Sequence, residues 1–205
     1  MPNWCSNGIT LRHADSAMID RAVKGKDGLL MEFMPTPQDL VDTVAGSFGD
    51  GDKQAALEAQ QASNIRKYGY KDWYDWNVAN WGTKWDVSLE SLERVDANTL
   101  TASFESAWAP PLEAYNRLLD LGFEIVAYYY EPGMAFVGKY DNGIDECYEY
   151  SGTDSKTVRD TIGEELDDYF GISESMAEWE DEEKEEVQLW YEDGVEKLEA
   201  KEAAK

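Results

Sequence analysis

Carboxylates are the side chains of this sequence that offer the most chemistry, as acids, bases or metal ligands. Three of them stand beside its most distinctive aromatic segments. These three are Asp86, Glu105 and Glu131. If they met in space, they would form an oxygen site for a hard cation or an acid pair for hydrolysis. The alternative is that they cap turns or pair with Lys84 and Arg117. Because acidic residues are so abundant here, we assign no catalytic residue and no metal ligand from them.

Other catalytic patterns are weak. A histidine-dependent triad would need His13, the sole histidine, beside a serine or Cys5, and its place at the end of a predicted strand suits a structural role equally. The sequence has no Gly-rich phosphate loop and no Cys/His metal cluster. Cys5 and Cys147 are interpreted as free thiols on strands, with a single disulfide as the alternative. We expect no enzymatic activity and no cofactor.

The charge of the chain is strongly acidic and unevenly placed. It has 43 acidic and 18 basic residues, a net charge of -25 and a pI near 4.2. Residues 141–205 hold 23 of the acidic residues and only 6 of the basic ones. Direct binding to nucleic acid is disfavoured because it depends on Lys and Arg releasing counterions from phosphates. We expect instead a host protein complex with a basic surface that normally holds nucleic acid.

Carboxylates repeated along a helix can place negative charge at spacings comparable with those of duplex phosphates. Such a surface could occupy a nucleic-acid-binding groove, whereas the alternative is a solvated tail without a partner. The candidates for this partner-binding acidic face are Glu164, Asp167, Asp168, Glu178, Glu182 and Glu186.

A second candidate region is aromatic. The segment Asn80–Asp86 carries Trp81 and Trp85 around a glycine and a lysine. Large rings at such a junction act either as a core clamp or as a platform for a ligand. Together with Trp108 and Tyr130 they are candidates for an aromatic cleft that binds a small ligand or nucleotide.

The elements that would position these residues follow from hydrophobic periodicity. A strand is predicted over 4–13, a short helix ending near Gly25, a helical insertion over about 36–82, and a hairpin over 85–104. Pro110 and Pro111 begin a helix that Gly122 closes, and strands follow at 123–130, 134–140 and 143–150. This order predicts an α+β fold of ferredoxin-like (split βαβ) type, an antiparallel sheet with a helical insertion.

Four separated segments then carry a family resemblance. They are Met1–Asn7 (MPNWCSN), Asn80–Asp86 (NWGTKWD), Phe104–Pro111 (FESAWAPP) and Tyr130–Phe136 (YEPGMAF). In this order they resemble the YubB-type family of plasmid and phage proteins with a ferredoxin-like domain, over residues 1 to about 140. The resemblance implies that fold and an origin on a mobile genetic element. It brings no catalytic residue.

The remainder of the chain is read as an acidic helical segment, so we predict domains at 1–150 and 151–205. One helix is predicted over 154–170, with Val158, Ile162, Leu166 and Phe170 on one side, and another follows Gly171. The sequence lacks a membrane-length apolar run and a signal peptide, so we expect a cytoplasmic protein. The leading hypothesis is a phage or plasmid interaction protein that inhibits a host nucleic-acid-binding or defence complex by DNA mimicry, of anti-CRISPR or anti-restriction type. A ligand-binding module at the aromatic cleft and a carboxylate-based hydrolase are the alternatives.

Overall fold

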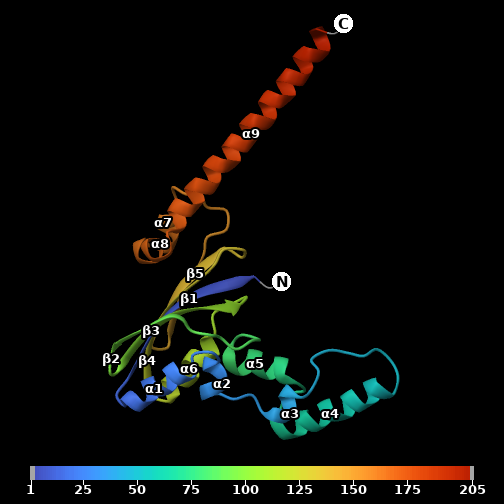
Figure 1. Cartoon of the computed structure of the whole chain (residues 1–205), viewed down its shortest axis with the longest axis vertical. Helices are drawn as coiled ribbons and strands as arrows, with labels where there is room; N and C mark the ends of the chain where they lie inside the picture. Colours follow the sequence, from blue (N-terminus) through green and yellow to red (C-terminus); the bar gives the residue numbers. More distant parts are fainter. Residues whose placement is uncertain (1–2, 204–205) are drawn as a thin grey trace. The chain divides into compact units, whose positions relative to one another are not determined.

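The computed structural model describes the backbone of residues 3–203 and the side chains of residues 3–191. The chain divides into two compact units, Met1–Cys147 and Tyr148–Lys205. We call them unit 1 and unit 2 and describe each by itself. Figure 1 shows the strands and most of the helices in unit 1 and only helices after the last strand.

Unit 1 is built on a sheet with the strand order β2-β3-β1-β4-β5-β6, whose last strand crosses the boundary between the units. The pairs β1/β3, β1/β4, β2/β3 and β4/β5 are antiparallel. The α+β class expected from the sequence is therefore confirmed. The strands are β1 (Trp4–His13), β2 (Glu90–Asp96), β3 (Thr99–Ala107), β4 (Phe123–Glu131), β5 (Phe136–Asp141) and β6 (Ile144–Glu149).

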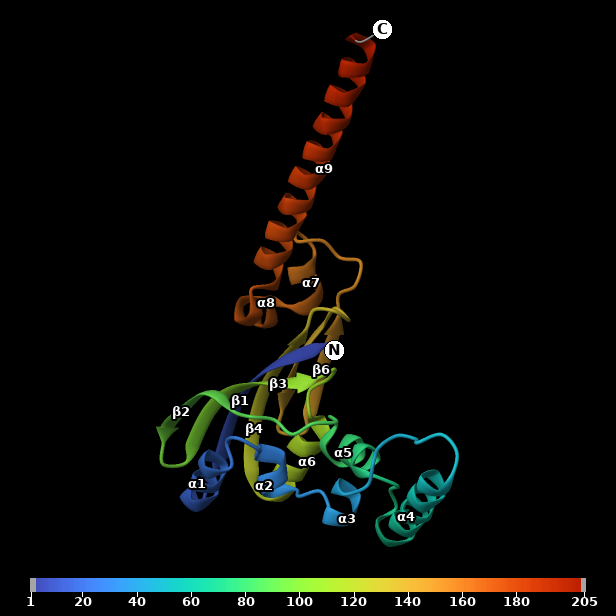
Figure 2. The ribbon, with the colours of Figure 1, turned by 45° about the vertical axis from the view of Figure 1, so that its right-hand side comes forward.

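The core of unit 1 lies between this sheet and three helices, α1 (Ser16–Lys24), α2 (Leu29–Phe33) and α6 (Leu112–Asp120). Figures 1 and 2 show the three helices on the same face of the sheet. Leu11 of β1 stands opposite Leu100 of β3 and Ile125 of β4, so that one buried apolar row crosses three strands. Alternation along the strands is what presents this row to the helices.

One strand begins later than the sequence predicts. We expected the hairpin to start at Trp85, because Trp85, Val87 and Leu89 alternate with polar residues, but β2 begins at Glu90. The backbone of this segment bonds to the α1–α2 region instead: Leu29 N–H donates to the Val87 carbonyl at 3.1 Å, and Leu89 N–H donates to the Lys26 carbonyl at 2.7 Å. Val87 and Leu89 still enter the core without a strand partner.

The helical insertion contains α3 (Gln38–Val41), α4 (Asp52–Tyr68) and α5 (Trp73–Trp81). Figure 2 shows α3 and α4 to one side of the sheet, whereas α5 lies next to α6. Buried Asn64 of α4 ties the insertion together, because its amide donates to Thr43 Oγ1 at 2.8 Å and to the Lys71 carbonyl at 3.0 Å.

Unit 2 consists of α7 (Val158–Ile162), α8 (Glu164–Phe170) and α9 (Ile172–Ala203). The single helix predicted over 154–170 is wrong, because Gly163 adopts a φ of +85° and separates α7 from α8. Val158, Ile162 and Leu166 of the predicted stripe are buried nevertheless. Among the residues that the structure describes, none of the helices is both long and apolar enough to span a membrane.

Gly82 provides a test of this packing, with Gly69 as its matched control. Both end helices with a left-handed φ, +83° and +84°. A Cβ on Gly82 would lie 3.1 Å from Leu112 N and 3.3 Å from Glu113 N, whereas a Cβ on Gly69 would meet nothing within 4 Å. We expect Gly69→Ala to lower the free energy of unfolding by about 1 kcal/mol for backbone strain. Gly82→Ala should lose a further 1–3 kcal/mol, roughly, for overpacking.

The measurement is urea unfolding of the full chain, followed by circular dichroism for both variants and the unmodified protein. If the two variants lost the same free energy of unfolding, the close approach of Gly82 to α6 would make no measurable contribution to stability.

Candidate functional site

Lys84 and two tryptophans form the most distinctive surface of unit 1. The Lys84 ammonium lies 3.9 Å from the ring centroid of Trp85 and 4.0 Å from that of Trp108. Trp4 adjoins Trp85 with ring centroids 5.8 Å apart. The three indoles are between 41% and 47% exposed. A cation held by two ring faces orders the rings without burying them, so they remain available for contact.

One residue of the predicted aromatic cleft, Trp81, lies elsewhere. Trp81 is buried in the core, and its Nε1–H donates to the Met34 carbonyl at 3.0 Å, so it acts as a clamp rather than as part of a cleft. Tyr130 pairs with Ser6 and Val137 inside the sheet. The structure therefore brings together Trp85 and Trp108, and adds Trp4 and Lys84 to them.

The positions of these residues follow from the end of α5. After Gly82 turns the chain, the Thr83 hydroxyl donates to the Ala107 carbonyl of β3 at 3.4 Å. The buried Asn77 amide donates to the Lys84 carbonyl at 2.8 Å and thereby fixes the backbone that carries the lysine. Both contacts are made within or next to α5, so the aromatic surface sits on a rigid element.

A cavity of about 420 Å³ adjoins this surface. Its size is in the range of small-ligand sites. It is lined by Ala45, Gly46, Lys71, Asp72, Trp73, Tyr74, Asp75, Lys84 and Trp85. Asp72 is not among the candidates taken from the sequence. The signal available there was a carboxylate between aromatic residues, Tyr70 before it and Trp73 and Tyr74 after it.

The three carboxylates considered for catalysis all accept hydrogen bonds that serve the fold. Asp86 accepts from the backbone N–H groups of α2, at 2.8 Å from Leu30 N, while burial raises its pKa. Glu131 accepts from Gly133 N and Met134 N, and Glu105 accepts from a serine hydroxyl of β1. Capping, the alternative stated for these residues, describes Asp86 and Glu131.

Neither His13 nor Cys5 is arranged as a nucleophile or base. The Asp15 N–H donates to His13 Nδ1 at 3.0 Å, and His13 Nε2 lies 3.1 Å from the Leu121 carbonyl, so both ring nitrogens serve local structure. Burial raises the pKa of the Cys5 thiol to about 12. Neither Cys5 nor Cys147 is in a disulfide, in agreement with the interpretation as thiols on strands. Within residues 3–191, whose side chains the structure describes, no group of three His, Cys, Asp or Glu side chains is placed to hold a metal ion.

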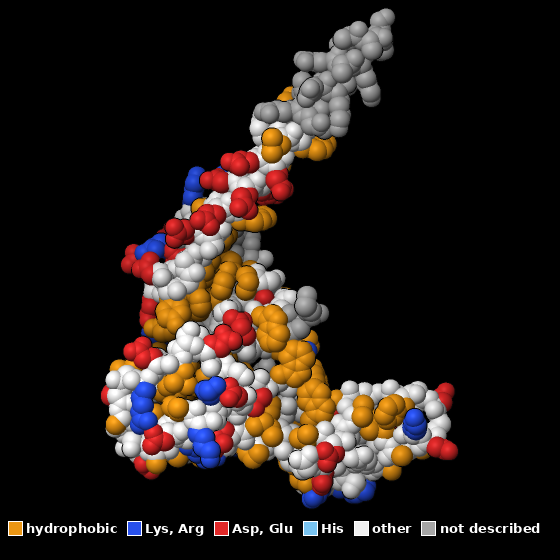
Figure 3. Space-filling view, in the orientation of Figure 1, with side chains coloured by type: hydrophobic (Ala, Val, Ile, Leu, Met, Phe, Trp, Pro, Cys, Tyr) orange, Lys and Arg blue, Asp and Glu red, His pale blue; other side chains and the backbone are white. Residues whose placement is uncertain are grey.

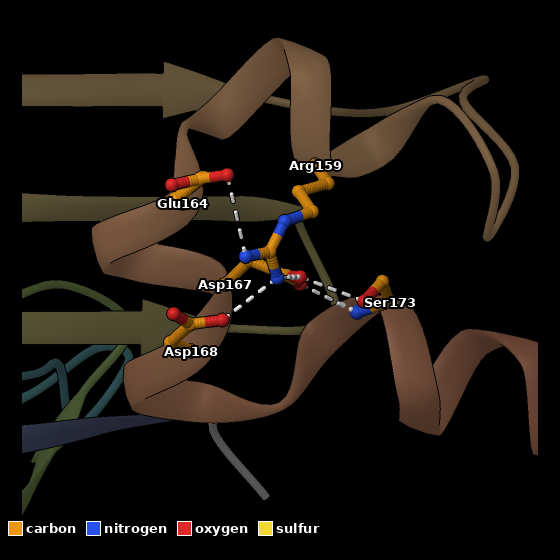
Figure 4. Close-up of polar contacts among 5 residues, drawn as sticks. All are labelled: Arg159, Glu164, Asp167, Asp168 and Ser173. Atoms are coloured by element: carbon orange, nitrogen blue, oxygen red, sulfur yellow. Dashed lines mark hydrogen bonds and ion pairs between the residues drawn. The ribbon is translucent and has the colours of Figure 1, made fainter.

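Unit 2 contains an ion-pair cluster around Arg159 of α7, drawn in Figure 4. Its guanidinium lies 2.9 Å from Asp167 Oδ2, 2.7 Å from Asp168 Oδ1 and 3.7 Å from Glu164 Oε1. Asp167 is only 2% exposed, and it also accepts from the N–H and the hydroxyl of Ser173, each at 2.7 Å. The cluster thereby joins α7, α8 and the first turn of α9.

The electrostatics of Asp167 follow from these contacts. Burial favours the neutral acid, but the hydrogen bonds from Ser173 and the Arg159 ion pair outweigh it, so the pKa of Asp167 lies below its usual value. The hydrogen bonds to Asp168 and Asp167 raise the pKa of Arg159. Three of the six candidate acidic residues are thus used inside unit 2.

The other three candidates, Glu178, Glu182 and Glu186, lie exposed on α9. Trp179 and Trp190 are eleven residues apart, about three helical turns, and therefore share one side of the helix. Glu182, Glu183 and Glu186 follow Trp179 at three, four and seven residues and lie on the same side. We call these two tryptophans and three glutamates the α9 face. Glu178 lies about 100° around the helix from Trp179.

The α9 face is open in the described part of the chain. Trp179 is 62% exposed and Trp190 is 78% exposed. Figure 3 shows acidic side chains crowded along α9 with hydrophobic ones among them. The described cation of this helix, Lys184, pairs with Asp181 at 2.7 Å, away from the α9 face. The α9 face therefore presents carboxylates and indoles to solvent.

Comparison with known proteins adds little to this geometry. No family model and no curated protein matches the chain. Among solved structures, the chain is similar to the crystal structure of protein api92 from Yersinia pseudotuberculosis, described under the family model DUF1281. The two are 15% identical, and the match covers 75% of this chain and 99% of api92 with a TM-score of 0.40. Similarity this low supports no functional argument, and the YubB-type resemblance stays a prediction.

The Arg159 cluster predicts a difference between two substitutions at pH 7. Arg159→Gln leaves the buried Asp167 carboxylate without its cation and should lower the stability of unit 2 by about 1–3 kcal/mol. Glu164→Gln removes an exposed partner at 3.7 Å and should change stability by less than about 1 kcal/mol. Hydrogen exchange of the α7 and α8 amides in the full chain measures the local effect. Equal protection in the two variants would contradict a structural role for the cluster.

The lowered pKa of Asp167 predicts acid sensitivity. Its stabilising contribution is complete above the pKa of an unfolded aspartate, about 3.9, and is lost as the pH falls through the lower pKa of the folded state. Asp167→Asn should therefore weaken unit 2 at pH 7, and the difference from the unmodified chain should shrink below about pH 4. Hydrogen exchange at pH 7 and pH 3 measures it, and a difference that does not change with pH would contradict the assignment.

Proposed function

We propose that the protein is a non-enzymatic interaction protein that binds its target through the α9 face. One observation carries the proposal: three exposed carboxylates lie between two exposed indoles on the same side of one helix. A helix that served only for solubility would have no use for two largely exposed tryptophans. Aromatic anchors surrounded by charge are instead typical of protein interfaces.

The charge of α9 selects the chemistry of the target. Residues 172–191 contain eight acidic side chains and one lysine. Self-association through this helix would bring like charges together, so a second copy is disfavoured. A target with a basic groove and apolar pockets would satisfy both the glutamates and the indoles. Grooves that normally hold a nucleic-acid strand have this composition, since aromatic side chains stack on bases and cations follow the backbone.

We therefore propose a host nucleic-acid-binding or defence complex as the target, with inhibition by DNA mimicry of anti-CRISPR or anti-restriction type. The YubB-type resemblance, which implies a phage or plasmid origin, supports this choice, and we propose that the protein acts in the host cytoplasm. Direct binding to nucleic acid is not part of the proposal, because the net charge of -25 opposes it.

We also propose that the sheet of unit 1 is of ferredoxin-like type. The support is the succession β1, α1, β2, β3, α6, β4 and the neighbouring order β2-β3-β1-β4 within the sheet. In this reading α2 to α5 form the insertion and β5 and β6 extend the sheet.

Two sets of substitutions with equal charge change test the α9 face. The test set is Glu182→Gln, Glu183→Gln and Glu186→Gln, and the control set, on the opposite side of α9, is Glu174→Gln, Asp181→Asn and Glu185→Gln. The tagged full chain is used to capture host complexes at about 0.1 M and about 0.5 M salt, a range over which exposed charge contacts weaken. A captured nucleic-acid-binding complex that duplex DNA displaces is then measured with each set.

We expect the test set to weaken binding by about tenfold or more, chiefly through slower association, and the control set to change it less than about threefold. Trp190→Ala should also weaken binding, through faster dissociation, because it removes an apolar anchor. Equal effects of the two charge sets would show that only net charge matters and would contradict the α9 face as the site. Capture of no complex displaced by DNA would contradict the mimicry itself for that host.

A further inference from the structure

The cavity beside Trp85 contains a buried carboxylate that is only half used. Asp72 lines the cavity and is 1% exposed. Its Oδ1 caps α5 by accepting from Asp75 N at 3.1 Å. Its Oδ2 is buried and has no hydrogen-bond partner among the residues that the structure describes. A buried carboxylate oxygen without a donor is costly, so a ligand donor that reaches this oxygen would be stabilising. Because the oxygen is shielded from solvent, the contact requires a small shift of a neighbouring side chain such as Trp73 or Tyr74, both of which are only half-buried.

The lysines of the cavity indicate where an anionic group would lie. Lys71 lies 3.2 Å from Asp75 and is neutralised by it. Lys84 has no ion pair within the described residues and is held only by the indoles of Trp85 and Trp108. A phosphate near Lys84 would supply the missing counterion, and the ammonium can act as a point charge for it.

The walls of the cavity favour a flat ring. Trp73, Tyr74 and Trp85 line it, and the rings of Trp73 and Tyr74 meet edge to face at 5.9 Å. None of the three is fully buried. Indole and phenol faces stack on nucleobases whatever the base, which is why single-stranded nucleic-acid sites use them. The cavity thus offers a stacking surface, one hydrogen-bond acceptor and one uncompensated cation.

We propose that this cavity binds a nucleotide whose base carries an amino group. The base stacks on the aromatic wall, its amino N–H donates to Asp72 Oδ2, and its phosphate pairs with Lys84. Lys71 and Asp75 pair with each other, so Asp72 and Lys84 are the two charged groups of the lining that are left for a ligand, and a cationic ligand at Asp72 is the competing outcome of the test. The site is in unit 1 and is independent of the proposed function of α9.

Matched ligands separate the three contacts. Adenosine 5′-monophosphate is the probe, purine riboside 5′-monophosphate lacks the amino group, adenosine lacks the phosphate, and methylguanidinium stands for a cationic ligand. Binding to the full chain is measured by isothermal titration calorimetry. We expect the first to bind about tenfold or more tightly than the second and the third, because each of these leaves one buried or charged protein group unpaired. No binding of adenosine 5′-monophosphate, or binding of methylguanidinium instead, would overturn the proposal.

Matched variants test the two polar contacts. Asp72→Asn keeps an oxygen for the cap of α5 but replaces the free acceptor by a donor, and its control is Asp15→Asn, which caps α1 through Ala17 N at 3.0 Å. Lys84→Gln removes the cation, and its control is Lys53→Gln on the exposed side of α4. Each test variant should weaken binding about tenfold and each control less than about twofold.

The two proposals fail separately. The Glu182, Glu183 and Glu186 substitutions on α9 should leave nucleotide binding unchanged, whereas the cavity variants should leave capture of the target complex unchanged. If Asp72→Asn does not fold, Lys84→Gln tests the nucleotide site alone. It should lower the affinity for adenosine 5′-monophosphate, and the affinity should then depend less on salt concentration because the cation is lost. Unchanged affinity in Lys84→Gln would overturn the site as proposed.

Discussion

The approach of Gly82 to the first turn of α6 is the constraint on which unit 1 depends. Its backbone comes so close to Leu112 and Glu113 that a Cβ would lie 3.1 Å from the nearer nitrogen. The residue before it, Trp81, is in the core, and the lysine two residues after it is on the surface. One turn therefore joins the inserted helices to the sheet and separates a structural indole from the exposed ones. Trp85 and Trp108 reach the same lysine only because this turn holds.

The abundant carboxylates divide into those that the fold uses and those that it leaves free. Asp86 and Glu131 each accept from backbone N–H groups, and Asp167 is enclosed by Arg159 and Ser173. Such carboxylates contribute to local structure and have no charge left for a partner. The α9 face differs because its glutamates have exposed indoles as neighbours instead of cations. In a chain with so much negative charge, a high local number of carboxylates does not indicate a functional site. The neighbours of each carboxylate are the better guide.

Local patterns predicted most of the elements but not the contacts between them. The strand over 4–13, the short helix ending near Gly25 and the helix after Pro111 depend on neighbours in sequence, and the structure has all three. The segment from Trp85 to Leu89 has strand alternation, but its backbone hydrogen bonds go to Lys26 and Leu29, some sixty residues earlier, which no local pattern records. Likewise, nothing in the sequence distinguishes Asp167 from its acidic neighbours. The sequence does show that Arg159 is the one arginine of the last third. This indicates an ion pair with one of the nearby carboxylates but does not say which one.

The same reasoning explains why a strongly acidic chain can still hold a site for an anion. Net charge governs long-range attraction, which salt screens beyond about 8–10 Å, whereas binding in a cavity depends on the groups within contact distance. Around the cavity of unit 1 the carboxylate of Asp75 is already matched by Lys71, and the free cation is Lys84. Local balance there is close to neutral, with an acceptor on one side and an ammonium on the other. Global repulsion would slow the entry of a nucleotide more than it would weaken the bound state, so the acidic α9 face and a nucleotide site in unit 1 are compatible in one protein.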